Sequence, residues 1–145
     1  MANRLTDFVE ENGILSEFQA GFRKGYSTVD SIFVLTSLVK LRLRFPRQKV
    51  YAFFVDLKAA FDGVDREYLF FKLLDAGVSE KFVGLLRSMY RDTSASVWTC
   101  DGCTESFPVH TGVRQGCPLS LVLFAIFIND LVNEMRHGVR LDSRW

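Results

Sequence analysis

The feature that most constrains the fold of this chain is a run of aromatic and β-branched residues, VYAFFV, which ends in a carboxylate at Asp56. The run begins after Lys49 and contains no polar residue, glycine or proline. Such a run predicts a buried β-strand over residues 49–56. Any fold for this chain must therefore bury that strand.

The remaining elements are predicted from apolar spacing and from residues that favour helix ends. Helices are predicted over residues 5–12, over 28–44, after each of the N-caps Asp65 and Ser79, and over 119–136. Residues 95–99 and 105–109 are predicted to pair as a hairpin. This order lacks the regular βαβ alternation of a doubly wound sheet. We therefore predict an α+β fold, with helices packed on a small, mostly antiparallel sheet.

Length and composition restrict the class of protein. At 145 residues the chain has room for one domain or for part of a larger one. Its 48% hydrophobic and 24% charged residues are typical of a globular chain and exclude intrinsic disorder. The longest apolar run, residues 121–128, is far below the roughly 18 residues that a membrane span needs. Because the N-terminus also lacks a signal-peptide core, we expect an intracellular protein, nuclear or cytoplasmic, that is not secreted and has no membrane partner.

Positive charge is concentrated in one part of a chain whose net charge is only +1. Residues 21–50 hold one acidic residue, Asp30, and these basic residues: Arg23, Lys24, Lys40, Arg42, Arg44, Arg47 and Lys49. A basic stripe of this kind is typical of a surface that binds phosphate backbones. The alternative is that Lys40, Arg42 and Arg44 only stabilise the C-terminal end of a helix, where cations interact favourably with the helix dipole.

One residue, Asp56, and one loop, residues 111–120, have residue types that are common in catalytic or ligand-binding sites. Asp56 would stand at the end of a buried strand, where a carboxylate can bind a hard cation such as Mg²⁺. Alternatively, it caps the turn that follows at Leu57 and Lys58. The loop TGVRQGCPLS, residues 111–120, has backbone amides near a predicted helix start and suits an anion or nucleotide. The alternative for this loop is a tight turn into the helix, and the residue types leave both positions open.

Three blocks of the sequence resemble one known family. Residues 19–28, QAGFRKGYST, are similar to the Q-x-G-F-R-x-G-x-S-T block of reverse transcriptases. Residues 53–62, FFVDLKAAFD, are similar to motif A of that family, F-x-D-L-x-x-A-F-D. Residues 112–120, GVRQGCPLS, match motif B in the form found in non-LTR (LINE-like) retrotransposons. The blocks occur in the family's order, and the resemblance covers residues 19–135.

The resemblance implies a fold and an activity. The chain, residues 1–145, would be a partial reverse transcriptase domain, a fingers–palm fragment of a right-hand polymerase. About residues 1–48 would lie on the fingers side, and about residues 49–137, with motifs A and B, on the palm side. The intact enzyme would be an RNA-directed DNA polymerase, a nucleotidyltransferase with Mg²⁺ as cofactor. Its partners would be an RNA template, a DNA primer and a dNTP, and we expect a monomer.

The resemblance also implies roles for single residues. Asp56 matches the catalytic aspartate that binds both Mg²⁺ ions, and the Leu57 carbonyl would be a further metal ligand. Phe61 matches an aromatic steric gate that excludes a ribose 2′-hydroxyl. The nucleotide-binding residues implied beside this gate are Arg114, Gln115 and Gly116. The template-binding residues implied by the first block are Gly21, Phe22, Arg23, Lys24 and Ser27.

The chain also departs from the family pattern. Motif C, an aromatic-Ala-Asp-Asp hairpin that supplies the other metal carboxylates, does not occur in the 145 residues, and neither do the thumb and primer-grip motifs. Tyr26 stands where the family usually has Arg, and Leu121 where it usually has Pro. Because one carboxylate cannot hold two metal ions, we expect this fragment to be inactive alone. The alternative function is a non-catalytic, nucleic-acid-binding remnant of a retroelement.

Overall fold

A computed structural model of the protein describes residues 1–131. The helices are α1 (Ala2–Glu11), α2 (Thr28–Leu43), α3 (Arg66–Asp75), α4 (Glu80–Arg91) and α5 (Pro118–Ile128). The strands are β1 (Ser94–Ala95), β2 (Trp98–Thr99), β3 (Gly102–Cys103) and β4 (Phe107–Pro108). All five predicted helices are confirmed, although α5 ends at Ile128 and residues 132–136 of its predicted range lie outside the described residues.

Local signals set several helix ends. The Asp65 side chain accepts a hydrogen bond from a first-turn amide of α3 at 2.9 Å, so its predicted role as a cap is confirmed. Gly77, with φ of +83°, follows α3 in the left-handed conformation that ends many helices. The Ser27 hydroxyl caps α2 through a 3.1 Å hydrogen bond. Ser79 is the N-cap residue of α4, but its side chain makes no capping bond.

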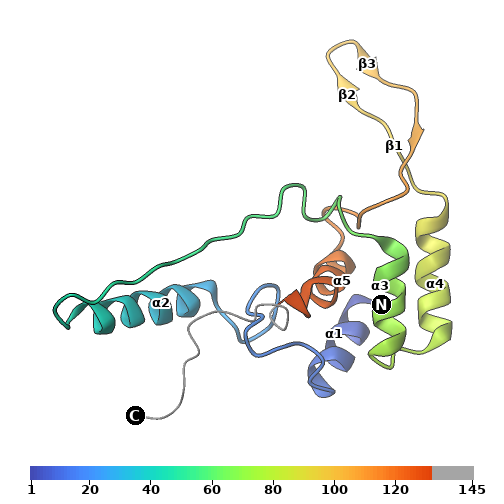
Figure 1. Cartoon of the computed structure of the whole chain (residues 1–145). Helices are drawn as coiled ribbons and strands as arrows, with labels where there is room; N and C mark the ends of the chain where they lie inside the picture. The colour runs from blue at the N-terminus through green and yellow to red at the C-terminus, as the bar shows by residue number, and fades with distance from the viewer. Residues whose placement is uncertain (132–145) are drawn as a thin grey trace.

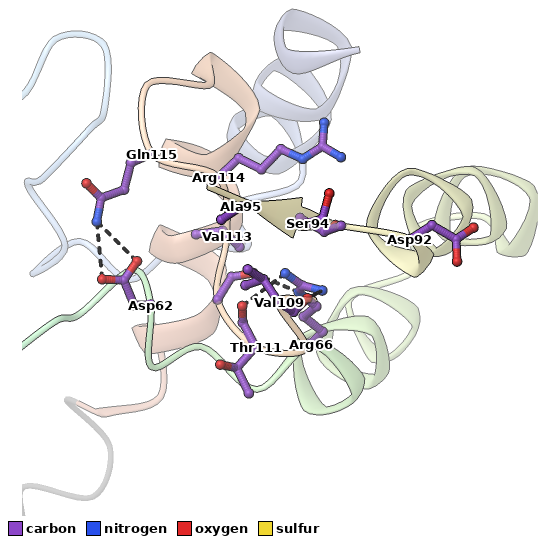
Figure 2. Close-up of a pocket in the computed structure, with 12 residues that line it drawn as sticks. Asp62, Arg66, Asp92, Ser94, Ala95, Val109, Thr111, Val113, Arg114 and Gln115 are labelled. Atoms are coloured by element: carbon purple, nitrogen blue, oxygen red, sulfur yellow. Dashed lines mark hydrogen bonds between the residues drawn. The ribbon is translucent and has the colours of Figure 1, made fainter. Parts of the chain in front are cut away.

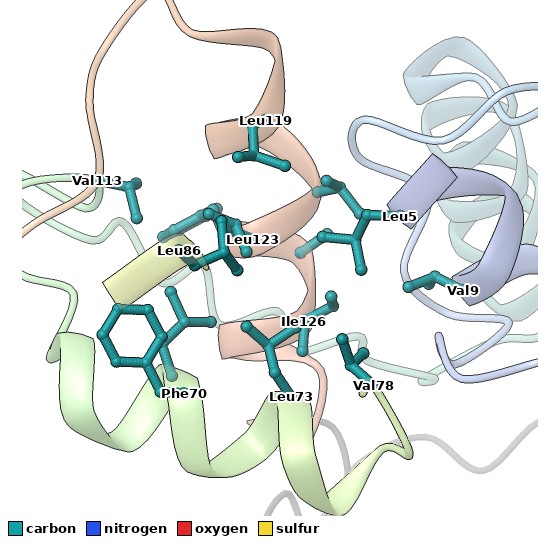
Figure 3. Packing of buried hydrophobic residues seen from close by; sticks show 14 of the residues in the cluster. Leu5, Val9, Phe70, Leu73, Val78, Leu86, Val113, Leu119, Leu123 and Ile126 are labelled. Carbon is teal, nitrogen blue, oxygen red and sulfur yellow. The ribbon is translucent and has the colours of Figure 1, made fainter. Parts of the chain in front are cut away.

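The hydrophobic core is built around α5, as Figure 3 shows. The sequence of α5, PLSLVLFAIFI, has no charged side chain, and a helix that is apolar on all sides is stable only when it is buried. Helices α1 and α3 pack on α5, and α4 packs on α3. Leu123 of α5, Leu73 of α3 and Leu86 of α4 are fully buried. Each such side chain contributes about 1.5–3 kcal/mol relative to an exposed one.

The predicted hairpin is confirmed as two short antiparallel pairs along one projecting ribbon (Figure 1). Strand β1 pairs with β4 in the register Ser94↔Pro108, and β2 pairs with β3 in the register Trp98↔Cys103. The predicted mixture of helices and small antiparallel sheets is therefore confirmed for the described residues, but the helices do not pack on a sheet as predicted. Helices α1, α3, α4 and α5 pack on one another, because their own apolar faces supply the core, and the ribbon extends away from them.

The strand predicted over residues 49–56 does not form. The segment is irregular, and Tyr51, Phe53 and Phe54 are 84%, 89% and 77% exposed. A strand is stabilised by the ladder of a neighbouring strand, and none of the described strands lies beside this segment. Helix α2, which precedes it, has no buried residue, and both extend away from the helical core in Figure 1. We call residues 28–57 the arm.

No helix within residues 1–131 combines the length and the apolar composition needed to cross a membrane. The arm nevertheless carries many exposed apolar side chains, including Val29, Ile32, Phe33 and Phe45 at 60–69% exposure. An exposed apolar surface of this extent marks a surface that another segment or molecule normally covers.

Candidate functional site

Asp56 and Leu57 lie at the end of the arm, where both are exposed. Within residues 1–131 no group of three or more His, Cys, Asp or Glu side chains is placed to hold a metal ion. A Mg²⁺ ion prefers several oxygen ligands in near-octahedral geometry. The metal-binding role of Asp56 and of the Leu57 carbonyl stays a prediction.

Phe61 lies in the turn that connects the arm to α3, and it is half-buried. Its ring stacks on Phe124 of α5, with the ring centroids 4.7 Å apart and the planes at 19°. The edge of Phe22 meets both rings, at 6.0 Å from Phe61 and 6.4 Å from Phe124. These three rings bring together the first block, motif A and the helix that follows motif B. Stacked and edge-to-face pairs of this kind fix ring orientation.

A pocket of about 510 Å³ opens beside these rings. Its lining consists of Phe22, Phe61, Gln115, Gly116 and residues of the first turn of α5. The Ser120 hydroxyl, 1% exposed, belongs to this lining and has no hydrogen-bond partner in the described part of the chain. Two of the predicted nucleotide-binding positions and the predicted gate therefore border one pocket.

The loop before α5 is fastened to the turn that carries Phe61. The Val113 amide donates to the Phe61 carbonyl at 2.9 Å, and the Gly112 amide donates to the Val64 carbonyl at 2.8 Å. The Gln115 side-chain amide donates to the two carboxylate oxygens of Asp62 at 3.1 and 3.3 Å (Figure 2). The separation of Phe61 and Gln115 is thus set by backbone and side-chain bonds between these two segments.

Only glycine fits at position 112, because the loop before α5 comes very close to the turn that carries Phe61. Its φ is +82°, a conformation that L side chains rarely adopt. A Cβ atom at this position would lie 2.8 Å from the Asp62 Cα and 3.0 Å from the Phe61 carbonyl oxygen. The first glycine of motif B therefore has a steric reason in this structure.

Arg66 is a residue of this region that the sequence analysis missed. It begins α3 and is 9% exposed, and its guanidinium donates to the backbone carbonyls of Tyr90, Val109, Thr111 and Gly112 at 2.8–3.1 Å. Burial lowers the pKa of this guanidinium from its usual value. One signal was available in the sequence, because a cation in the first turn of a helix opposes the helix dipole and indicates some other role.

Arg114 faces a different side of the loop from Gln115. Its guanidinium donates to the Met89 carbonyl at 2.8 Å and lies 5.7 Å from the centre of the Tyr90 ring. Arg114, Gln115 and Asp62 all belong to the lining of a second pocket of about 570 Å³, which lies beside Arg66 and the base of the hairpin (Figure 2). The structure therefore does not bring Arg114 to the pocket beside Phe61, and its nucleotide-binding role stays a prediction.

The predicted template-binding residues differ in their surroundings. The Arg23 side chain is 7% exposed, makes two hydrogen bonds to the Glu10 carboxylate at 2.7 and 3.0 Å, and stacks over Tyr26 at 4.0 Å. This pairing lowers the pKa of Glu10 and raises that of Arg23. Lys24, by contrast, is exposed. Arg23 therefore has an internal structural role, and Lys24 has the better access to a ligand.

The other members of this set have local roles in the chain. Gly21 lies in a turn, the Ser27 hydroxyl caps α2, and Phe22 places its ring on Phe61. Phe22 has φ of +62°, a strained conformation for an aromatic residue. Nothing in the described residues tests whether these side chains contact a template, so their template-binding roles also stay predictions.

Comparison with known proteins identifies the family. Residues 1–142 match the family model described as reverse transcriptase (RNA-dependent DNA polymerase). The chain is 32% identical over 131 residues to a probable RNA-directed DNA polymerase from transposon BS of Drosophila melanogaster. It is 32% identical over 135 residues to the RNA-directed DNA polymerase from mobile element jockey of Drosophila funebris. These matches cover 90% and 91% of this chain.

A third relative is the retrovirus-related Pol polyprotein from type-1 retrotransposable element R2 of Popillia japonica, 27% identical over 108 residues and 74% of this chain. The chain spans 14% of the length of the transposon BS and jockey proteins and 18% of that of the R2 protein. Relatives described as polymerases do not favour the alternative of a non-catalytic remnant. The fold elements, the paired motifs A and B and these matches agree, and the chain belongs to the reverse transcriptase family as a partial domain of the kind found in non-LTR retrotransposons.

Proposed function

We propose that this chain is the part of an RNA-directed DNA polymerase that holds the incoming deoxynucleotide. In this reaction the 3′-hydroxyl of a primer attacks the α-phosphate of a dNTP, the bond to the β-phosphate breaks, and pyrophosphate leaves. The observation that carries the proposal is that Phe61 of motif A and Gln115 and Gly116 of motif B line one pocket. That arrangement is supported by the bonds between the two motifs.

Phe61 would select the sugar of the nucleotide. Its ring is supported from behind by Phe124 at 4.7 Å, so it presents a flat surface of fixed orientation to the pocket. A ring of this kind under the sugar would collide with a ribose 2′-hydroxyl and admit a deoxyribose. The size and the support of the ring both favour the role of steric gate.

The polar part of the pocket lining suits the polar parts of a nucleotide. The first turn of α5 has no side-chain cap, and the positive end of its dipole is available to a phosphate, although Pro118 has no N–H and the Ser120 amide already donates to the Cys117 carbonyl at 2.9 Å. Gln115 has its amide oriented by Asp62, and the buried Ser120 hydroxyl has an unused hydrogen-bonding capacity. These groups would bind and orient the nucleotide without taking part in proton transfer.

The metal and template parts of the proposal rest on the family relationship. Asp56 and the Leu57 carbonyl are the proposed Mg²⁺ ligands, and the ion would supply the charge that stabilises the transferred phosphoryl group. The RNA template would contact exposed cations, of which Lys24 and Arg44 are examples. We also propose that the fingers–palm division falls near residue 48, between the basic region and the segment with motif A.

The experiment joins these 145 residues to the remaining sequence of the jockey relative and measures kcat/KM for a dNTP and for the matching rNTP. Phe61→Ala should lower the dNTP preference roughly tenfold or more, because it removes the group that the 2′-hydroxyl would meet. Phe71→Ala, at an exposed phenylalanine of α3, is the matched control and should leave the ratio unchanged. A ratio that Phe61→Ala does not alter would show that Phe61 is only a packing residue.

A further inference from the structure

Arg66 is an unusual residue for its position. It is a cation in the first turn of α3, is 9% exposed, and forms no ion pair within residues 1–131. Burying a guanidinium without a carboxylate is unfavourable unless its donors are all engaged, and an apolar side chain would often stabilise a fold equally well. The dipole of α3 opposes the charge as well. The charge of Arg66 therefore does not account for an arginine here, and its hydrogen bonds have to.

The hydrogen bonds of Arg66 indicate what the arginine does. Its Nε donates to the Gly112 carbonyl at 2.8 Å, Nη2 to Thr111 at 2.9 Å, and Nη1 to Val109 at 2.9 Å. Nη1 also donates to the carbonyl of Tyr90, the second-to-last residue of α4, at 3.1 Å. One planar group with fixed donor directions thus holds the carbonyls of Val109, Thr111 and Gly112, at the start of motif B and just before it, against the ends of α3 and α4.

The loop that Arg66 holds continues directly into the pocket. The amides of Gly112 and Val113 bond to the turn that carries Phe61, and Gln115 follows two residues later. Gly112 thus takes part in two sets of bonds, donating its amide to Val64 and accepting from Arg66. A shift of the Arg66 guanidinium would move this loop relative to Phe61.

We propose that Arg66 is a positioning residue, which sets the separation between Phe61 and Gln115 by fixing the carbonyls of residues 109, 111 and 112. This inference rests on the proposed function, in which both side chains contact the incoming nucleotide. Arg66 does not line the pocket beside Phe61 and acts on the nucleotide only through Gln115 and the loop.

The test uses the polymerase that contains this chain and measures kcat and KM for a dNTP on enzyme whose active fraction has been titrated. Arg66→Lys keeps the charge and replaces the planar fork by a single nitrogen. It should raise KM for the dNTP roughly tenfold, because a displacement of about 1 Å can cost up to about 100-fold. Arg87→Lys is the control, at an arginine whose side chain is 44% exposed and pairs with Glu67. It should leave KM unchanged.

A double-mutant cycle shows whether Arg66 acts through Gln115. If it does, Arg66→Lys should raise KM much less in a Gln115→Ala background than in the parent enzyme. Amide hydrogen exchange gives a second readout, since Arg66→Lys should speed the exchange of Gly112 and Val113 more than that of buried amides in α3.

The outcomes separate the inference from the proposed function. If Gln115→Ala leaves KM for the dNTP unchanged, the nucleotide site itself is wrong, whatever Arg66 does. If Gln115→Ala raises KM while Arg66→Lys reduces only the titrated active fraction, Arg66 supports the fold and the positioning role is refuted. Additive effects of the two substitutions on KM would refute it as well.

Discussion

Replacing Gly112 by alanine tests the contact on which the site depends. The added Cβ would meet the Asp62 Cα at 2.8 Å, the Asp62 carbonyl oxygen at 2.9 Å and the Phe61 carbonyl oxygen at 3.0 Å. All three atoms belong to backbone, so no flexible side chain can move aside. The two segments must separate. The hydrogen bonds that the Gly112 amide donates to the Val64 carbonyl and the Val113 amide donates to the Phe61 carbonyl must then lengthen or break.

The size of the effect follows from two contributions. A non-glycine residue in the left-handed region costs about 1–2 kcal/mol. Two weakened backbone hydrogen bonds cost about 1 kcal/mol each. Gly112→Ala should therefore lower the free energy of unfolding by roughly 3–4 kcal/mol.

Gly77→Ala is a matched control, because Gly77 has φ of +83° against +82° at Gly112. The nearest atom to its added Cβ is the Phe8 Cζ at 4.0 Å, an ordinary contact. This variant should lose only the backbone contribution, about 1–2 kcal/mol. Urea unfolding followed by far-UV circular dichroism measures both variants. Equal losses, within about 0.5 kcal/mol, would refute the claim that Gly112 is needed for the close approach.

Three further predictions concern the 145-residue polypeptide alone. It should show no primer extension on an RNA template with Mg²⁺ and dNTPs, because Asp56 cannot hold two ions alone; extension that Asp56→Ala abolishes would contradict this. It should bind an RNA hairpin with a Kd of about 10⁻⁴ to 10⁻⁶ M that weakens steeply with salt. Lys24→Glu should weaken binding to unrelated RNAs alike, and binding that ignores both salt and this change would exclude a phosphate-binding surface. Arg23 holds the pKa of Glu10 below its usual value. The pair should therefore stabilise the fold at pH values above the ordinary glutamate pKa, and this contribution should be lost as the pH falls through the lowered pKa of folded Glu10. Urea midpoints at about pH 7 and about pH 3.5 should therefore differ less in Glu10→Gln than in the parent chain, and an equal difference would contradict it.

Elements with local signals are the ones that the sequence predicts well. The cap at Asp65, the stop at Gly77 and the apolar spacing between them define α3 without knowledge of its neighbours. The hairpin is predicted for the same reason, since its strands are close in sequence. The structure brings Phe61, Gln115 and Gly116, which the family resemblance singled out, to the lining of one pocket, and their nucleotide-binding roles stay predictions.

The failures all involve partners that are distant in sequence or absent from the described residues. The segment 49–56 has the composition of a strand, but a strand forms only against another strand. Arg23 looks like a free cation until Glu10, thirteen residues earlier, is seen to bind it. The position of Arg66 in the first turn of a helix marks it as unusual, but the sequence does not identify its partners, because they are backbone carbonyls, the farthest of them 46 residues away. No side-chain pattern identifies a carbonyl partner.

Between Asp56 and Phe61 the chain changes from the exposed arm to a turn that is hydrogen-bonded and packed against the helical core. This change separates the proposed metal-binding residue from the proposed nucleotide-binding residues. Phe61 accepts a backbone bond from Val113 and stacks on Phe124, so the nucleotide side of the site is fixed by the helical core. Asp56 is exposed at the end of the unpaired arm. If the proposed roles hold, selection of the sugar would depend on the described residues, whereas the position of the proposed metal-binding carboxylate, Asp56, would depend on the pairing of residues 50–55 with a further strand. Variants of Gly112 and Arg66 should therefore act on nucleotide selection, and variants of the arm should act on metal binding.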